Sequence, residues 1–124
     1  MTTHYDYVGT IFENETNPNK PTVAFTLANK ALEKGYSAAI ILMVDAVSMS
    51  ISGAIDNIDI GAPFGGLKAL QEAFIEKGGK ILVCKACMVH NKITPEQIDS
   101  RFDIIDGGEV VDLIMNAKGS LQIS

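Results

Sequence analysis

An uninterrupted apolar segment occupies residues 37–44 and reads Ser37-Ala38-Ala39-Ile40-Ile41-Leu42-Met43-Val44. A strand with one face in water alternates apolar and polar side chains, and this segment does not alternate. Continuous apolar strands are typical of parallel sheets, in which helices cover both faces. The segment therefore predicts a buried strand of a parallel sheet, which Asp45 ends.

The segments before and after this strand alternate between strand and helix patterns. Further strands are expected at residues 5–12, 80–84, 102–105 and 121–123. Helices are expected at residues 18–34, from 65–66 to 78–79, at 86–90, from Thr94 onward, and at 108–118 after a cap at Asp106. This succession predicts an α/β three-layer sandwich, flavodoxin-like, with a mostly parallel sheet of about five strands and right-handed crossovers. A chain of 124 residues forms one domain of this kind, over residues 1–124.

The charge of the chain limits its partners. Ten Lys and Arg residues stand against fifteen Asp and Glu residues, and the net charge is -5 with no basic cluster. Because nucleic-acid binding depends on phosphate neutralisation, we expect no direct binding of nucleic acid. The amino terminus lacks the pattern of a secretion signal and no apolar run can span a bilayer, so a cytoplasmic protein without a membrane segment is expected.

The only two cysteines of the chain are Cys84 and Cys87, and Cys84 ends the strand predicted at residues 80–84. In parallel sheets, catalytic groups gather at the carboxyl ends of the strands. At the start of a helix, free backbone N–H groups stabilise a thiolate, and Lys85 adds positive charge. Such sites lower a cysteine pKa from about 8.5 to ~3.5–7.5, which predicts a nucleophilic Cys84. The alternative is a small buried apolar residue at the end of a strand.

Cys87 follows one helical turn later and can approach Cys84. The pair could therefore form a disulfide, or Cys87 could resolve a modified Cys84. A core-facing side chain on the helix is an equally good interpretation of Cys87. The position of Cys84 at the strand end ranks it above Cys87.

Five other residues are candidates for partner or substrate binding. His90 completes a Cys-x-x-Cys-x-x-His spacing, but three such positions on one helix do not converge on a tetrahedral ion and a fourth ligand is missing. We therefore expect no metal and no cofactor, and assign Lys85 and His90 to tuning the thiols or binding a partner. Asp45 follows a buried strand. Gly65-Gly66 could place a helix terminus against an anion, although a flexible turn is the favoured interpretation because the spacing of a phosphate loop is absent.

Four segments are similar to those of a known family: residues 24–35 (AFTLANKALEKG), Asp45-Ala46-Val47, Ile81-Leu82-Val83-Cys84 and Thr94-Pro95-Glu96. In these segments the chain resembles the DsrE/DsrF-like family of small sulfur-relay proteins, which includes the subunits of the tRNA-thiolation sulfur carrier complex. The resemblance implies that Cys84 accepts sulfur as a persulfide, that the partners are sulfur donor and acceptor proteins, and that the chain forms a homo-oligomer, a trimer or hexamer. The sequence departs from the family where Asn91-Lys92-Ile93 replaces an Arg-Gly-Ile turn.

Three functions follow from these observations. The first is a sulfurtransferase-like carrier, in which Cys84 takes a persulfide sulfur and passes it to an acceptor protein. The second is a redox protein that cycles Cys84 and Cys87 as a dithiol. The third is a non-enzymatic oligomeric module that binds a small ligand at the strand ends. A buried and unreactive pair of thiols would favour the third.

Overall fold

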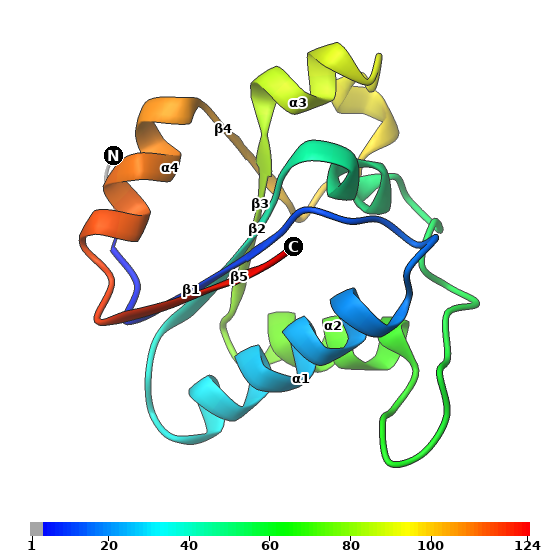
Figure 1. The fold of residues 1–124 in the computed structure, drawn as a ribbon, viewed down its shortest axis with the longest axis vertical. Helices are drawn as coiled ribbons and strands as arrows, with labels where there is room; N and C mark the ends of the chain where they lie inside the picture. Colours follow the sequence, from blue (N-terminus) through cyan, green and yellow to red (C-terminus); the bar gives the residue numbers. More distant parts are fainter. Residues whose placement is uncertain (1–3) are drawn as a thin grey trace.

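The computed structural model describes residues 4–124 and contains a five-stranded sheet with helices on both faces (Figure 1). The strands are β1 (Tyr7–Ile11), β2 (Ala38–Leu42), β3 (Lys80–Cys84), β4 (Asp103–Ile105) and β5 (Gly119–Ile123). The helices are α1 (Asn19–Glu33), α2 (Leu67–Glu76), α3 (Lys85–His90) and α4 (Gly107–Met115), with 3-10 helices η1 (Val44–Ser50) and η2 (Pro95–Gln97). Residues 1–3, on which the expectation about a secretion signal partly depends, lie outside the described residues.

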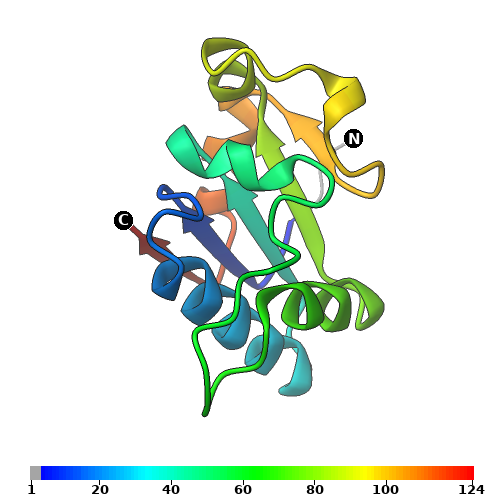
Figure 2. The ribbon, with the colours of Figure 1, turned by 90° about the vertical axis from the view of Figure 1, so that its right-hand side faces the viewer.

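The order of the strands explains how the helices are distributed. All neighbouring strands are parallel, in the order β4-β3-β2-β1-β5. From β1 to β3 each strand is added on the same side of the last, so right-handed crossovers place α1 and α2 on one face. The chain then returns from β4 across the sheet to β5, and α4 covers the opposite face (Figures 1 and 2). This arrangement confirms the predicted three-layer α/β fold.

Both faces of the central strand β2 are covered. All five of its residues are buried, as the uninterrupted apolar sequence predicts. Ile40 and Leu42 belong to the cluster under α1 and α2, whereas Ala39 and Ile41 belong to the cluster under α4. Burial of a large aliphatic side chain contributes about 1.5–3 kcal/mol, so this strand anchors both layers of the core.

The boundary at the end of β2 differs from the sequence prediction. The strand stops at Leu42 rather than at Val44, because Val44 has a φ of 54° and begins the 3-10 helix η1. The chain therefore passes from β2 into a helix that ends at Ser50, and the strand is shorter than the apolar run. Extended backbone requires negative φ, and the left-handed conformation of Val44 turns the chain away from the sheet.

The helix caps agree with the sequence pattern. The Asp106 carboxylate accepts the Glu109 N–H at 2.8 Å and the Glu109 carboxylate accepts the Asp106 N–H at 3.0 Å, which forms a capping box. The helix that begins there ends at Met115 and not at 118, since Asn116 caps it. Within residues 4–124, no helix has the length and apolar character that crossing a membrane requires.

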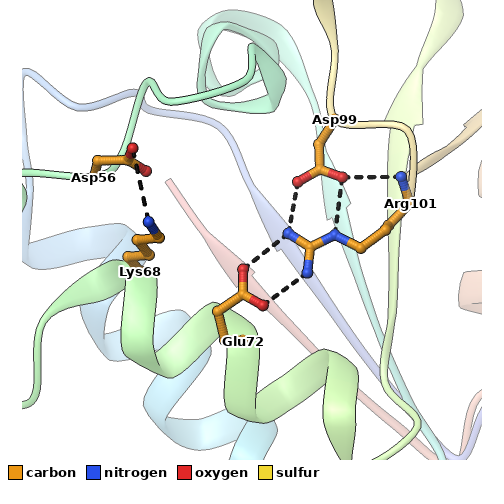
Figure 3. A network of polar contacts seen from close by, with 5 residues as sticks. All are labelled: Asp56, Lys68, Glu72, Asp99 and Arg101. Carbon is orange, nitrogen blue, oxygen red and sulfur yellow. Dashed lines mark hydrogen bonds and ion pairs between the residues drawn. The ribbon is translucent and has the colours of Figure 1, made fainter.

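An arginine fastens the segment before β4 to α2 (Figure 3). The Arg101 guanidinium donates to both carboxylate oxygens of Glu72, at 2.7 and 2.8 Å, and to both oxygens of Asp99, at 2.7 and 3.0 Å. These hydrogen bonds hold the pKa of each carboxyl below its ordinary value. Exposed ion pairs contribute only about 0–1 kcal/mol each to stability. The main effect of the planar Arg101 guanidinium is therefore to fix the segment before β4 against α2.

We predict that Gly79→Ala destabilises the fold. A Cβ at this position would lie 2.5 Å from ring carbons of Phe74, which is fully buried and packs edge-on against Phe25 with ring centroids 5.7 Å apart. Since the ring has no space to move into, the expected cost is about 1–3 kcal/mol in the free energy of unfolding, measured by urea denaturation.

Gly119→Ala is the matched control for this substitution, because its Cβ would meet no atom within 4 Å. Its expected change is within about 0.5 kcal/mol. Equal urea midpoints for the two variants would show that the Phe74 ring does not require a glycine beside it.

Candidate functional site

The two thiols lie at the carboxyl end of β3. Cys84 is the last residue of this strand and the residue that precedes the first turn of α3. It is only 5% exposed, and the strand register pairs it with Ile105 at the end of β4. Cys87 lies in the first turn of α3, where it is partly exposed and packs against the larger core cluster.

At this end of the sheet, the connections that follow β3 and β4 run to opposite faces. The chain that leaves β3 passes through α3, whose Met88 joins the cluster on the α1 and α2 face. The chain that leaves β4 passes into α4 on the opposite face. In open α/β sheets, ligands bind outside the carboxyl ends of neighbouring strands whose connections go to opposite faces. Cys84 lies at this position in the topology.

A backbone amide from the neighbouring strand end contacts the second thiol. The Val44 N–H donates a hydrogen bond to Cys87 Sγ, with 3.2 Å between nitrogen and sulfur. The contact exists because Val44 has a φ of 54°, a left-handed conformation that is unusual for a β-branched residue. Such strained backbone persists only where the surrounding structure holds it in place.

The side chain of Asn91 links α3 to Val44, which lies just beyond the end of β2. Its Nδ2 donates to the Cys87 carbonyl oxygen at 2.8 Å and reaches the Val44 carbonyl oxygen at 3.5 Å. Asn91 also ends α3, so one residue contacts both the helix that carries Cys87 and the strained residue that donates to its sulfur. This arrangement supports Val44 in its left-handed conformation.

The turn that follows α3 keeps its shape without a glycine. Lys92 has a φ of 60°, and it stands where the resemblance leads us to expect glycine. The Ile93 N–H bonds to the Met88 carbonyl at 2.9 Å and the Lys92 N–H bonds to the Val89 carbonyl at 3.1 Å, the pattern of a Schellman cap. The replacement of Arg-Gly-Ile by Asn91-Lys92-Ile93 therefore changes the side chains but leaves a tight turn.

The surroundings of Cys87 raise its pKa above the ordinary 9.0. Burial is the largest cause, because it disfavours the thiolate. The Val44 N–H opposes this effect, while the neighbouring thiol of Cys84 and the negative charge of Asp45 reinforce it. Cys87 is therefore mostly protonated at neutral pH, and its thiolate is stabilised by one backbone donor.

The structure brings together some of the residues that the sequence singles out and separates others. Cys84, Cys87 and Asp45 share one region, since the carboxylate of Asp45 influences the titration of Cys87. Lys85 and His90 are exposed on α3. Within residues 4–124, no three His, Cys, Asp or Glu side chains form a group suited to a metal ion.

Gly65 and Gly66 lie elsewhere. The segment at 57–66 that ends with them is at the opposite end of the molecule from α3 in both views (Figures 1 and 2). The Leu67 N–H at the start of α2 bonds to the Ile58 carbonyl at 2.9 Å, and a Cβ on Gly66 would lie 3.7 Å from a carboxylate oxygen of Asp59. These groups are acceptors, so this helix terminus offers little to an anion.

Sequence reasoning missed Val44 and Asn91. The apolar run places Val44 in the strand, since nothing in such a run indicates a left-handed residue. In the sequence, Asn91 differs from the family turn and gives no other signal. A polar residue four positions after Cys87 is the one signal of a side chain that could bond back to the Cys87 carbonyl.

The sequence of the chain is similar to those of known proteins. The profile of the DsrE/DsrF-like family matches residues 7–122. Over 88 residues, which are 71% of this chain, the sequence is 30% identical to an uncharacterised protein of Methanocaldococcus jannaschii. The chain spans about a third of the length of that curated relative, since the match covers 32% of it.

Solved structures share the fold. The YchN protein of Escherichia coli superposes with a TM-score of 0.67 at 17% identity, covering 98% of this chain and 99% of that one. A protein of unknown function from Methanobacterium thermoautotrophicum superposes with a TM-score of 0.69 at 10% identity, covering 95% and 98% of the two chains. At these identities the likeness shows the three-layer fold alone.

We predict that Asn91→Ala raises the pKa of Cys87 further. Without the side chain that contacts Val44, the N–H of this strained residue is held less firmly against the sulfur, and the thiolate loses stabilisation. The alkylation rate of Cys87 by iodoacetamide, followed by peptide mass spectrometry across pH, should have its midpoint above 9.0 in the native protein. The midpoint in Asn91→Ala should be higher still.

Asn116→Ala is the matched control, because Asn116 caps α4 in the same way, with Nδ2 donating to the Asp112 carbonyl at 2.8 Å. It should leave the alkylation profile of Cys87 unchanged. A midpoint in Asn91→Ala equal to or below that of the native protein would contradict the role given to the Val44 amide.

Proposed function

The chain belongs to the DsrE/DsrF-like family, and on this premise we propose that it is a sulfur carrier that holds a persulfide on Cys84 and passes the terminal sulfur to an acceptor protein. The observation that carries the proposal is the position of Cys84, at the end of β3 beside the point where connections diverge to opposite faces. A carrier needs a thiol that the sulfur can reach, either directly or through a second thiol. It requires no acid/base pair.

The burial of Cys84 suits the storage of a reactive sulfur. At 5% exposure, the residue is largely shielded from small thiols in solution that would reduce a persulfide. Persulfide exchange depends on access of the attacking thiolate to the terminal sulfur. A persulfide on Cys84 would therefore be longer-lived than one on the surface, as a carrier between two proteins requires.

The transfer conserves atoms and charge. In loading, a thiolate attacks the terminal sulfur of a donor persulfide, a new S–S bond forms, and the donor leaves as a thiolate. In unloading, the terminal sulfur passes from Cys84 to an acceptor thiolate, the bond to Cys84 Sγ breaks, and Cys84 becomes a thiolate again. No external oxidant or reductant is consumed in either step.

A dithiol redox function is the second candidate. It is favoured by the Cys-x-x-Cys spacing, because Cys84 directly precedes α3 and Cys87 lies in its first turn. Under this alternative the oxidised product is a Cys84–Cys87 disulfide, and the mass of the protein falls by two hydrogen atoms instead of rising by one sulfur atom.

We predict that Cys84→Ser abolishes stable sulfur loading. The native protein, incubated with a cysteine desulfurase and cysteine and then washed briefly with glutathione, should gain one sulfur atom in intact mass. Cys84→Ser should gain none that survives the wash, because Cys87 is partly exposed and a persulfide there would be reduced. Ala86→Ser, an exposed change on the same helix, is the control and should load normally. An adduct retained by Cys84→Ser, or absent from the native protein, would sink the proposal.

A further inference from the structure

The proposed carrier thiol is the less accessible of the two. Cys84 is 5% exposed at the end of a buried strand, whereas Cys87 is partly exposed in the first turn of α3. A donor protein carries its own persulfide on a side chain of limited reach. It would meet Cys87 before it could meet Cys84 without opening the structure.

The two thiols lie within one turn of the chain. Cys84 directly precedes α3 and Cys87 lies in its first turn. The neighbouring Cys84 contributes to the raised pKa of Cys87. The Val44 N–H approaches Cys87 Sγ at 3.2 Å and gives this sulfur a donor that stabilises negative charge. In thiol–persulfide exchange, this hydrogen bond offsets part of the penalty that burial places on Cys87 as a leaving thiolate.

We propose that Cys87 is the access thiol of this carrier, through which sulfur from a donor protein reaches Cys84. The inference rests on the proposed function. In the first step, Cys87 loses its proton to solvent and the resulting thiolate attacks the terminal sulfur of a donor persulfide, giving a Cys87 persulfide and a donor thiolate. In the second, the Cys84 thiolate attacks that terminal sulfur, the bond to Cys87 Sγ breaks, and Cys87 leaves as a thiolate under the Val44 N–H.

The Val44 amide favours this outcome over a competing one. Attack of Cys84 on the inner sulfur, Cys87 Sγ, would form a disulfide and release hydrosulfide, so the sulfur would be lost. The hydrogen bond from Val44 stabilises charge that develops on Cys87 Sγ, which happens only when the terminal sulfur is attacked. Asn91 is a positioning residue in this scheme, because it contacts the Val44 carbonyl and not the sulfur.

The test is single-turnover loading of Cys84 from a persulfidated cysteine desulfurase, in the native protein and in Cys87→Ser. We expect the variant to load more slowly by about tenfold or more, which corresponds to about 1.4 kcal/mol of barrier. Cys87→Ala should be slowed as well, which separates loss of the thiol from any effect of a serine hydroxyl. Ala86→Ser should load at the native rate. Unchanged urea midpoints would verify that the variants are folded.

Loading of Cys84 at the native rate in folded Cys87→Ser would overturn the inference and leave the proposed function intact. Accumulation of a Cys84–Cys87 disulfide with release of hydrosulfide from the native protein would also overturn it. By contrast, the absence of any sulfur on Cys84 in the native protein would refute the proposed function itself. The two failures are therefore distinguishable in one set of measurements.

Discussion

The burial of β2 on both faces is the constraint on which the rest of the molecule depends. A strand with five buried residues has no side that can face water, so helices must cover each side of it. Parallel neighbours and helical crossovers meet this requirement. As a consequence, the carboxyl ends of β2 and β3 lie at the same edge, and Val44 comes within hydrogen-bonding distance of Cys87.

Strain is concentrated at this edge. Val44 and Lys92 are the residues other than glycine that have positive φ within residues 4–124, and both lie next to α3. Left-handed backbone costs about 1–2 kcal/mol for a residue with a Cβ, and more where the side chain is branched. The Schellman cap after α3 stabilises Lys92, and the side chain of Asn91 supports Val44. The left-handed conformation of Val44 brings its N–H to 3.2 Å from Cys87 Sγ.

Most of the fold follows from patterns in the sequence. The apolar run at 37–44, the helical spacing at 18–34 and the box at Asp106 identify their elements because each reflects local burial or local capping. The position of Cys84 at a strand end follows from the same patterns. The strand order, in which β5 returns to lie beside β1, depends on contacts between distant segments. The sequence of a single segment therefore does not predict it.

The role that we propose for Cys87 does not follow from the sequence. The sequence ranks Cys84 above Cys87, because only Cys84 has a strand-end position and a family equivalent. The partial exposure of Cys87 and its bond from Val44 depend on the backbone conformation of a residue 43 positions away. A valine in a left-handed conformation runs against local preference, so no pattern in the sequence reveals it.

The most direct measurement is a time course that locates the added sulfur. Trypsin cleaves after Lys80, Lys85 and Lys92, so Cys84 and Cys87 fall in separate peptides, 81–85 and 86–92. After mixing with a persulfidated cysteine desulfurase, the protein is quenched with an alkylating reagent at successive times, digested and analysed by mass spectrometry. Sulfur should appear first on the peptide at 86–92 and then accumulate on the peptide at 81–85. Sulfur on neither peptide, or on 86–92 alone at completion, would contradict this prediction.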